Sequence, residues 1–180
     1  MCGRFHFGII PNEKGKEIKE RIEKLNLVFK TGEIFPTDNI LCVIPKENKT
    51  DLSVMKWGIK ANSLIINAKV ETIDDRLTFK SIKYNRCAVI SNGFYEWDNE
   101  KNKYYITTSD DYIYLACIFN ENKELVILTK AATNDFKHIH SRMPIIMNKQ
   151  EMFRYIHNED YSFEKKELNI SQISQEISLF

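Results

Sequence analysis

Residues 87–97 read Cys87-Ala88-Val89-Ile90-Ser91-Asn92-Gly93-Phe94-Tyr95-Glu96-Trp97, two short apolar and aromatic runs with a glycine between them. Runs of about four to eight such residues, bounded by turn residues, are typical of β-strands. We therefore predict strands at residues 87–90 and 94–97. Five more runs of this kind occur, at residues 40–44, 53–59, 104–107, 112–119 and 125–129. Together they predict a mainly antiparallel, barrel-like sheet system.

Other segments have the residue spacing of helices. In residues 12–27, Asn12 can cap a helix in which apolar residues recur every three or four positions among Lys and Glu. Similar spacing occurs in residues 74–84 and 149–157 and in a tail that carries Ile170, Ile173 and Ile177. No linker, repeat or low-complexity block divides the chain. We predict a single α+β domain over residues 1–180, with a β-rich core and a few flanking helices.

The composition sets limits on the class of protein. Of 180 residues, 43% are hydrophobic and 12% aromatic, enough to bury a sizeable core. The 26 Lys and Arg nearly balance 25 Asp and Glu, so the net charge is +1 and nucleic acid could bind only at a local basic patch. Apolar runs are far shorter than the roughly 20 residues of a membrane span, and no signal peptide opens the chain. We expect a soluble, cytoplasmic protein with no membrane partner.

Four cysteines, at positions 2, 42, 87 and 117, are scattered and include no Cys-x-x-Cys pair. The last three lie in apolar stretches typical of protein cores, which argues against a disulfide framework. The four histidines do not combine with cysteines or carboxylates at the spacings of metal ligands. We therefore predict neither a metal site nor a cofactor, and Cys2 stands apart from the other cysteines.

Cys2 follows the initiator methionine in the stretch Met1-Cys2-Gly3-Arg4. Removal of Met1 would leave a cysteine whose α-amine and thiol share one residue. In model compounds such an amine has a pKa of about 7.7–8 and the thiol a pKa near 8.5, so both nucleophiles are available near neutral pH. The amine can form an imine with an aldehyde, and the thiol can then close a thiazolidine ring. Alternatively, Cys2 is an ordinary terminal residue, and with Met1 retained only thiol chemistry remains.

Three polar residues in strand-edge or turn segments could assist such chemistry. Glu96 puts a carboxylate within the aromatic run 94–97, where it could give or take protons, or it could simply point to solvent. His140 precedes a short apolar run and could shuttle protons, although a single histidine is often structural. Asn67 ends the apolar run 64–66 and could orient a nucleophile or stabilise an oxyanion, or it could be a turn residue.

A local nucleic-acid surface could be built from cations and aromatic side chains. The cations could bind phosphates and the rings could stack on bases. The alternative is that these residues are solvated charges and core aromatics. They are Arg4, Lys69, Arg76, Arg86 and Arg142, with Trp57, Phe94, Tyr95 and Trp97. Spacing alone does not indicate that any of them converges with Cys2.

Five segments occur together in one order along the chain. They are Met1-Cys2-Gly3-Arg4-Phe5, Trp57-Gly58, Asn67-Ala68-Lys69-Val70-Glu71-Thr72, Gly93-Phe94-Tyr95-Glu96-Trp97 and Ile139-His140-Ser141-Arg142-Met143-Pro144. This combination resembles the SRAP family, the SOS response-associated peptidase domain, and the resemblance is clearest over residues 1–147. It implies an α+β fold with a β-rich core. The chain departs from the family pattern at Lys69, where Arg is usual, and at Ser141, where Asp is usual.

The resemblance also implies a reaction. Members of that family lose Met1 and use Cys2 to form a thiazolidine crosslink with the ring-opened aldehyde of an abasic site in single-stranded DNA or at a junction. Carried over by position, Asn67 would position Cys2, Glu96 would assist imine formation, and His140 would shuttle protons for sugar opening and crosslink reversal. The side chains that the resemblance puts near the DNA backbone are Arg4, Lys69, Thr129 and Arg142.

Three hypotheses about function are open at this point. The first is a monomer that captures abasic sites in single-stranded DNA through Cys2, with autopeptidase and lyase-like activity, and that associates with the nucleoid when crosslinked. The second is a cysteine peptidase or amidase with Cys2 as nucleophile and His140 as base. The third is a single-stranded DNA-binding module that forms no bond. We favour the first, because a peptidase does not explain the terminal cysteine and a binding module leaves Glu96 and His140 without a role.

Overall fold

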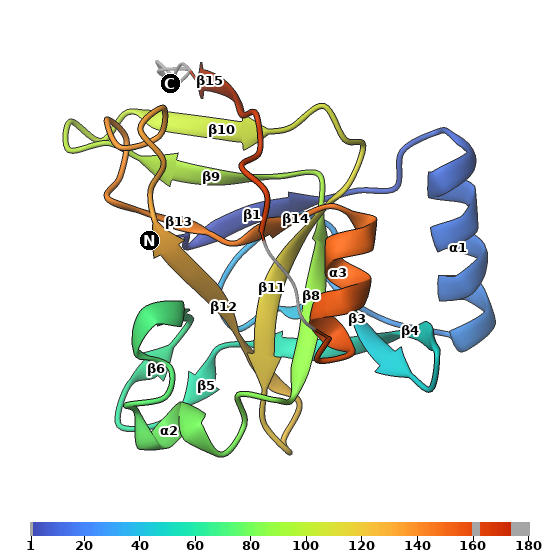
Figure 1. Cartoon of the computed structure of the whole chain (residues 1–180). Coiled ribbons are helices and arrows are strands. Elements are labelled where there is room, and N and C mark those ends of the chain that lie inside the picture. The colour runs from blue at the N-terminus through green and yellow to red at the C-terminus, as the bar shows by residue number, and fades with distance from the viewer. Residues whose placement is uncertain (1, 160–162, 174–180) are drawn as a thin grey trace, which may run out of the picture.

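The computed structural model describes residues 2–159 and 163–173 (Figure 1). Five of the described strands form an antiparallel sheet. Their bounds are β1 Arg4–Phe7, β2 Gly32–Ile34, β9 Gly93–Trp97, β10 Lys103–Thr107 and β15 Asn169–Ile173, and they lie in the order β15, β10, β9, β1, β2. Pairing places Phe5 opposite Phe94, and Ile106 opposite both Phe94 and Ile170. One face of this sheet is therefore apolar.

Eight further strands within the described residues form a second sheet. Their bounds are β3 Asn39–Lys46, β4 Lys49–Trp57, β7 Asn67–Lys69, β8 Arg86–Ser91, β11 Ile113–Phe119, β12 Glu124–Ala131, β13 Arg142–Pro144 and β14 Ile146–Met147. The strands β12, β4, β3, β8 and β11 pair in that order, and β11 pairs again with β12, so they close into a barrel. Pairing is antiparallel except where β12 meets β4 and β7. The predicted antiparallel, barrel-like core is confirmed.

The helices lie outside the sheets (Figure 1). Helix α1 is Glu13–Leu25, and the side chain of Asn12 caps it by accepting a hydrogen bond from a backbone N–H at 2.9 Å. Helix α3 is Lys149–Ile156 and begins with a capping box. The short elements are α2 Leu77–Lys80, a 3₁₀ turn Val70–Thr72, and a ribbon of β5 Ile59–Lys60 and β6 Leu64–Ile65. The helices predicted at residues 12–27 and 149–157 are confirmed, and no helix of the described chain could span a membrane.

Two predictions of helices are wrong. Residues 74–84 contain only the single helical turn α2, in which Phe79 is buried but Leu77 is 88% exposed, so the segment lacks the continuous apolar stripe of a longer helix. The tail forms the strand β15, in which Ile170 pairs with Ile106. Sheet pairing thus overrides the helical spacing of the tail. Ile177, the third residue of that pattern, lies outside the described residues.

The two sheets share an aromatic core. Phe5, Phe94 and Trp57 are fully buried, and the ring centroids of Phe5 and Trp57 are 5.2 Å apart. Gly93 permits close approach of β9 and β10, since a Cβ at this position would lie 2.6 Å from the carbonyl oxygen of Ile106. A side chain there would force the two backbones apart. The core therefore fixes β1 and β9, the two strands that adjoin the candidate site.

Candidate functional site

Cys2 lies immediately before β1 and is fully buried. Its backbone carbonyl accepts a hydrogen bond of 2.9 Å from the side-chain amide of Asn67. Asn67 is fixed on β7, which pairs with β12. The indole N–H of Trp57 donates to the carbonyl of the preceding residue, Ile66, at 3.0 Å. The structure therefore brings two of the predicted site residues into direct contact.

The amide of Asn67 has a second polar atom at the site. Its Oδ1 is buried and has no hydrogen-bond partner among the residues that the structure describes. Leaving a buried polar atom unpaired costs free energy, so such an atom calls for an explanation. Because the other end of the same amide holds Cys2, Oδ1 is an acceptor available close to the start of the chain.

The thiol of Cys2 is held in its protonated form. Sγ donates to the backbone carbonyl of Arg4 at 3.8 Å. Burial raises the pKa of the Cys2 thiol to about 12, and the charge of Glu96 is the next cause. Glu96 is 5% exposed on β9, so its carboxylate acts on the thiol across a poorly solvated region. The expectation of a readily available thiolate near neutral pH is wrong for the folded chain.

The other three cysteines lie together in the barrel. Cys87 and Cys117 are opposite each other on β8 and β11, and Cys42 on β3 pairs with Val89, two residues from Cys87. All four cysteines are free and buried, which confirms the prediction of three core cysteines. Burial raises the pKa of Cys87 well above its ordinary value, so this thiol is unreactive. Within residues 2–159 and 163–173, no group of three or more His, Cys, Asp or Glu residues is placed to hold a metal ion.

His140 precedes β13, and the backbone orients its ring. Nδ1 lies 2.9 Å from the backbone nitrogen of Arg142 and 3.0 Å from the carbonyl oxygen of the same residue. An unprotonated Nδ1 accepts from the N–H, whereas a protonated Nδ1 donates to the carbonyl. The ring can therefore exchange a proton without losing its orientation, provided that the main chain of Arg142 stays in place.

The turn between β12 and β13 packs on the sheet face that carries Glu96. Phe136 of this turn contacts Phe94 with ring centroids 5.9 Å apart, and His138 meets Tyr104 edge-on at 6.5 Å. Tyr104 is directly opposite Glu96 in the sheet. Because alternate residues of a strand share a face, these contacts all lie on one side of the sheet. The turn that leads to His140 is thus packed on the sheet face that carries Glu96.

Arg142 is held by protein groups. Its guanidinium makes two hydrogen bonds of 2.8 Å to the carboxylate of Glu71 and one of 2.6 Å to the carbonyl of Thr129. The hydrogen bonds from Arg142 lower the pKa of Glu71 to about 2. Thr129 is fully buried, and its hydroxyl donates to the carbonyl of Ala68 at 3.3 Å. Arg142 and Thr129, predicted near the DNA backbone, thus face protein partners, whereas Lys69 is exposed.

Arg4 lies on the other face of the five-stranded sheet. It pairs with the residue before Glu96, so the two side chains point to opposite faces. The Arg4 guanidinium lies 4.2 Å from the ring centroid of Phe35 and 4.9 Å from that of Trp97. Such stacking of a cation on aromatic rings is favourable. The structure therefore separates Arg4 from the residues around Cys2.

This outer face combines cations with aromatic rings. The ammonium of Lys103 lies 4.2 Å from the ring centroid of Tyr95, and both Tyr95 and Trp97 are partly exposed. They are the two predicted base-stacking residues that remain accessible. Trp57 and Phe94 are fully buried, so their predicted role in base stacking is wrong.

Two polar residues without a predicted role organise this region. Glu71 is the ionic partner of Arg142, and the side-chain oxygen of Asn92 accepts from the backbone N–H of Gly8 at 2.6 Å, which ties the end of β1 to the turn before β9. Glu71 and Arg142 are 71 positions apart in the sequence, and Gly8 and Asn92 are 84 apart. No local spacing could therefore reveal these contacts. For Glu71, the available signal was its place in the segment that also contains Asn67.

Iodoacetamide is expected to label native Cys2 slowly, because alkylation needs the thiolate and the pKa of this thiol is about 12. Intact-mass measurement should show four additions only after unfolding, one for each cysteine. Glu96→Gln removes the negative charge that helps to raise the pKa and should speed labelling of Cys2. Glu100→Gln, on an exposed turn, is the matched control and should change nothing. Rapid labelling of Cys2 in the folded wild type would contradict this reading.

Comparison with curated proteins finds several relatives. The chain is 26% identical over 177 residues to abasic site processing protein YoqW of Bacillus subtilis (strain 168), covering 82% of this chain and 76% of YoqW. It is 23% identical over 195 residues to abasic site processing protein YedK of Escherichia coli (strain K12), covering 95% and 86% of the two chains.

Solved structures share the fold. A protein from Bacteroides thetaiotaomicron matches with a TM-score of 0.76 at 18% identity, over 97% of this chain and 93% of that one. A protein from Bordetella bronchiseptica matches with a TM-score of 0.70 at 15% identity, over 96% and 100% of the two chains. The model of the family described as SOS response associated peptidase (SRAP) matches residues 1–179. With nearly its whole length matched, the chain belongs to the SRAP family.

Proposed function

We propose that this chain recognises abasic sites in single-stranded DNA and captures them as a thiazolidine crosslink through Cys2, after loss of Met1. The observation that carries this proposal is the contact between Asn67 and Cys2. Nδ2 of Asn67 holds the Cys2 carbonyl at 2.9 Å, and its buried Oδ1 has no partner among the described residues. Oδ1 can therefore accept a hydrogen bond from an α-amine freed at Cys2. The printed names of relatives, abasic site processing proteins, support the choice of substrate.

The reaction starts with hydrolysis of the peptide bond between Met1 and Cys2, which frees the α-amine. A ring-opened abasic sugar has an aldehyde at C1′. The lone pair of the amine attacks this carbon to give a carbinolamine, which loses water to form an iminium ion. The thiol sulfur then bonds to the same carbon while its proton is released, and the electron pair of the C=N bond moves to nitrogen. Ring closure is intramolecular, so proximity favours it.

Glu96 suits the first half of this sequence. Its charge raises the pKa of the Cys2 thiol, so the thiol stays protonated and the amine attacks first. The same carboxylate stabilises the positive charge that develops on the iminium nitrogen. It can also take the proton that the attacking nitrogen loses and pass it to the hydroxyl that leaves as water. Glu96 thereby makes the amine attack before the thiol, and it stabilises the iminium ion that forms between the two attacks.

His140 is the proposed proton carrier for sugar opening and for reversal of the crosslink. The main chain of Arg142 offers its ring both a donor and an acceptor, at 2.9 and 3.0 Å, so the ring keeps its orientation in either protonation state of Nδ1. A base that must accept and later return a proton benefits from such an arrangement.

The exposure of each predicted side chain determines whether it could contact the DNA strand as it now lies. Lys69 is exposed two residues after Asn67, which suits it to a phosphate near the captured sugar. Arg4, stacked between Phe35 and Trp97, offers a partly exposed guanidinium and accessible rings for bases. In our proposal Arg142 and Thr129 would contact the backbone only by exchanging their present protein partners for phosphate oxygens.

The test is a crosslinking reaction with processed protein. Intact-mass measurement first establishes loss of Met1, and the protein is then incubated with a labelled single-stranded oligonucleotide that carries one abasic site. We expect a heat-stable adduct on a denaturing gel, with a mass equal to protein plus DNA minus one water. Cys2→Ala should abolish it. Cys2→Ser retains the amine and should give an adduct only after borohydride reduction of the imine.

The other outcomes separate the competing functions. Absence of a stable adduct with processed wild-type protein would overturn the proposal. Salt-sensitive binding that survives Cys2→Ala, without any adduct, would indicate a non-covalent DNA-binding module. Peptide turnover that is abolished by Cys2→Ser would indicate a cysteine peptidase.

A further inference from the structure

Glu33 on β2 lies between two cations on the outer face of the five-stranded sheet. Nη1 of Arg4 donates to Oε1 of Glu33 at 3.2 Å, and the ammonium of Lys103 lies 2.7 Å from the same oxygen. The strand register puts Arg4 opposite Tyr95. It puts Lys103 opposite Trp97, two residues further along β9, so the cations and these rings share one face. Glu33 therefore occupies the point at which two positive charges converge.

The three charged groups leave one positive charge in excess. Partial burial acts to raise the pKa of Glu33, but the hydrogen bond and charge of Lys103, together with Arg4, outweigh burial and lower this pKa. The carboxylate is therefore ionised at neutral pH, and it balances only one of the two cations. An anion that reaches this group from solvent meets a net attraction.

Glu33 holds Arg4 in a way that permits exchange. A single guanidinium nitrogen of Arg4 donates to Glu33, whereas two nitrogens of Arg142 donate to the two oxygens of Glu71 at 2.8 Å. The bidentate geometry that fixes an Arg on a carboxylate is thus absent at Arg4. A phosphodiester has two unesterified oxygens and could give one to each cation, in place of the one oxygen that they now share.

Aromatic rings flank the two cations. The guanidinium of Arg4 lies 4.2 Å from the ring centroid of Phe35, and the ammonium of Lys103 lies 5.7 Å from that of Trp97. Phe35 is exposed and Trp97 is partly exposed, so both rings are accessible to bases on either side of a bound phosphate. Inorganic phosphate could use only the charges. The combination therefore suits a single nucleotide strand.

We propose that the outer face binds a phosphodiester of single-stranded DNA between Arg4 and Lys103, and that Glu33 competes with the phosphate for these cations. The choice of ligand rests on the proposed function. Competition by Glu33 weakens non-covalent binding to every strand, damaged or not. At an abasic site a covalent bond supplies the retention, so the lost affinity matters little there. Glu33 thereby lets the protein leave undamaged DNA and favours capture when undamaged strands are in excess.

The first test measures binding of a labelled, undamaged single-stranded oligonucleotide by fluorescence anisotropy. Glu33→Gln keeps the shape of the side chain without its charge and should bind about three- to tenfold more tightly than wild type. The slope of log K against log salt concentration should become steeper by about 0.7, because one more phosphate is neutralised. Unchanged affinity of Glu33→Gln would overturn the proposal.

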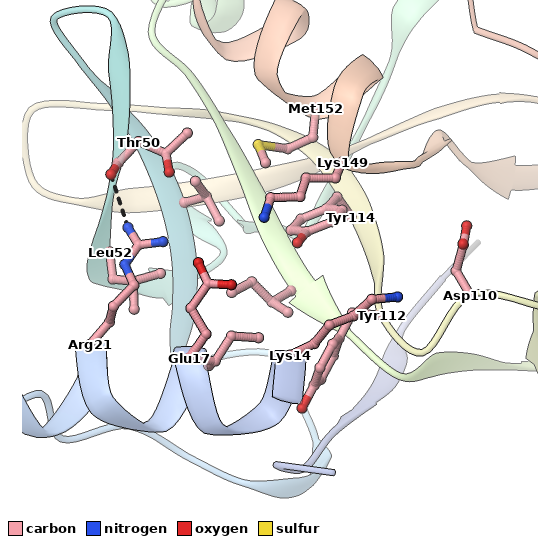
Figure 2. A pocket seen from close by; sticks show the side chains of 13 residues that line it. Lys14, Glu17, Arg21, Thr50, Leu52, Asp110, Tyr112, Tyr114, Lys149 and Met152 are labelled. Carbon is pink, nitrogen blue, oxygen red and sulfur yellow. Dashed lines mark hydrogen bonds between the residues drawn. The ribbon is translucent and has the colours of Figure 1, made fainter. Parts of the chain in front are cut away.

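A matched control accounts for the change in net charge. Figure 2 shows Glu17 on α1, where it lines a cavity of about 130 Å³ between α1, the barrel and α3. Glu17→Gln removes the same charge from this distant place and should bind the strand as wild type does. An equal gain in affinity for Glu17→Gln would indicate a general charge effect and overturn the proposal. So would displacement of the strand by inorganic phosphate beyond the effect of chloride at equal ionic strength, which would indicate a simple anion site.

A double-mutant cycle tests whether Glu33 and Lys103 act on the same phosphate. Lys103→Gln should weaken binding of the undamaged strand more in the Glu33→Gln background than in wild type, because Glu33 no longer occupies the cation. Lys149→Gln, on α3 in Figure 2, is the control and should give the same small change in both backgrounds. An equal loss for Lys103→Gln in the two backgrounds would contradict the competition.

Capture in the presence of excess undamaged strand tests the consequence for selectivity. The excess should slow adduct formation by Glu33→Gln several-fold more than it slows wild type. The two proposals fail in different ways. If wild type forms no adduct but Glu33→Gln still binds undamaged DNA more tightly, only covalent capture is wrong. If wild type forms the adduct and Glu33→Gln binds no more tightly, only the competition by Glu33 is wrong.

Discussion

Trp57→Ala is expected to lower the free energy of unfolding by about 3–5 kcal/mol, among the largest effects of any single substitution in this chain. Trp57 is fully buried, and its ring centroid lies 5.2 Å from that of Phe5. Its indole N–H also donates to the carbonyl of Ile66 at 3.0 Å. The substitution therefore opens a cavity between the two sheets and removes one of the two donors to this carbonyl, which keeps the backbone N–H of Ile127 at 3.1 Å.

Trp57→Phe tests how that loss divides between packing and hydrogen bonding. It keeps a ring in the core but removes the N–H, so we expect a cost of about 1–2 kcal/mol in denaturant unfolding. Because Ile66 directly precedes Asn67, this variant should also slow the crosslinking reaction while the protein remains folded. Trp97→Ala, on the partly exposed face, is the control for loss of an indole and should cost less stability. A cost below about 1 kcal/mol for Trp57→Ala would contradict the packing argument.

Strands could be predicted from the sequence where nearly every residue is buried. The runs at residues 87–90 and 112–119 correspond to β8 and β11, whose side chains face the barrel interior or the surrounding elements. A continuous apolar run is itself the signal of such a strand. The sequence could not predict β1 and β7. They are short and contain polar residues, and their pairing with β9 and β12 stabilises them.

The candidate site was only partly predictable. Cys2, Asn67, Glu96 and His140 could be named from motifs, but their relative placement depends on strand pairing between distant segments. The pKa of a free thiol was also a misleading guide to Cys2. Burial raises the pKa of Cys2, and no local sequence pattern reports burial. Motif position likewise does not say whether a cation already has a protein partner, and in this structure Arg142 pairs with the carboxylate of Glu71.

Glu71→Ala is expected to slow adduct formation by on the order of 10- to 100-fold, although Glu71 touches neither Cys2 nor the proposed substrate. Glu71 holds the Arg142 guanidinium with two hydrogen bonds of 2.8 Å. The main chain of Arg142 in turn orients the ring of His140. Loss of the carboxylate should allow β13 to shift. His140, the proposed proton carrier, would shift with it. Because the Glu71 side chain is 47% exposed, water screens the pair, and we expect a stability loss of only about 1 kcal/mol.

The pH dependence of stability distinguishes the ion pair from a simple packing contact. Folding lowers the pKa of Glu71 from 4.5 to about 2, so its contribution is complete above about pH 4.5 and is lost as the pH falls through about 2. The difference in unfolding free energy between wild type and Glu71→Gln should thus be constant near neutral pH and shrink in acid. Glu121→Gln, an exposed carboxylate in a turn, should show no such difference. If Glu71→Ala forms the adduct at the wild-type rate, His140 does not depend on this ion pair for its orientation.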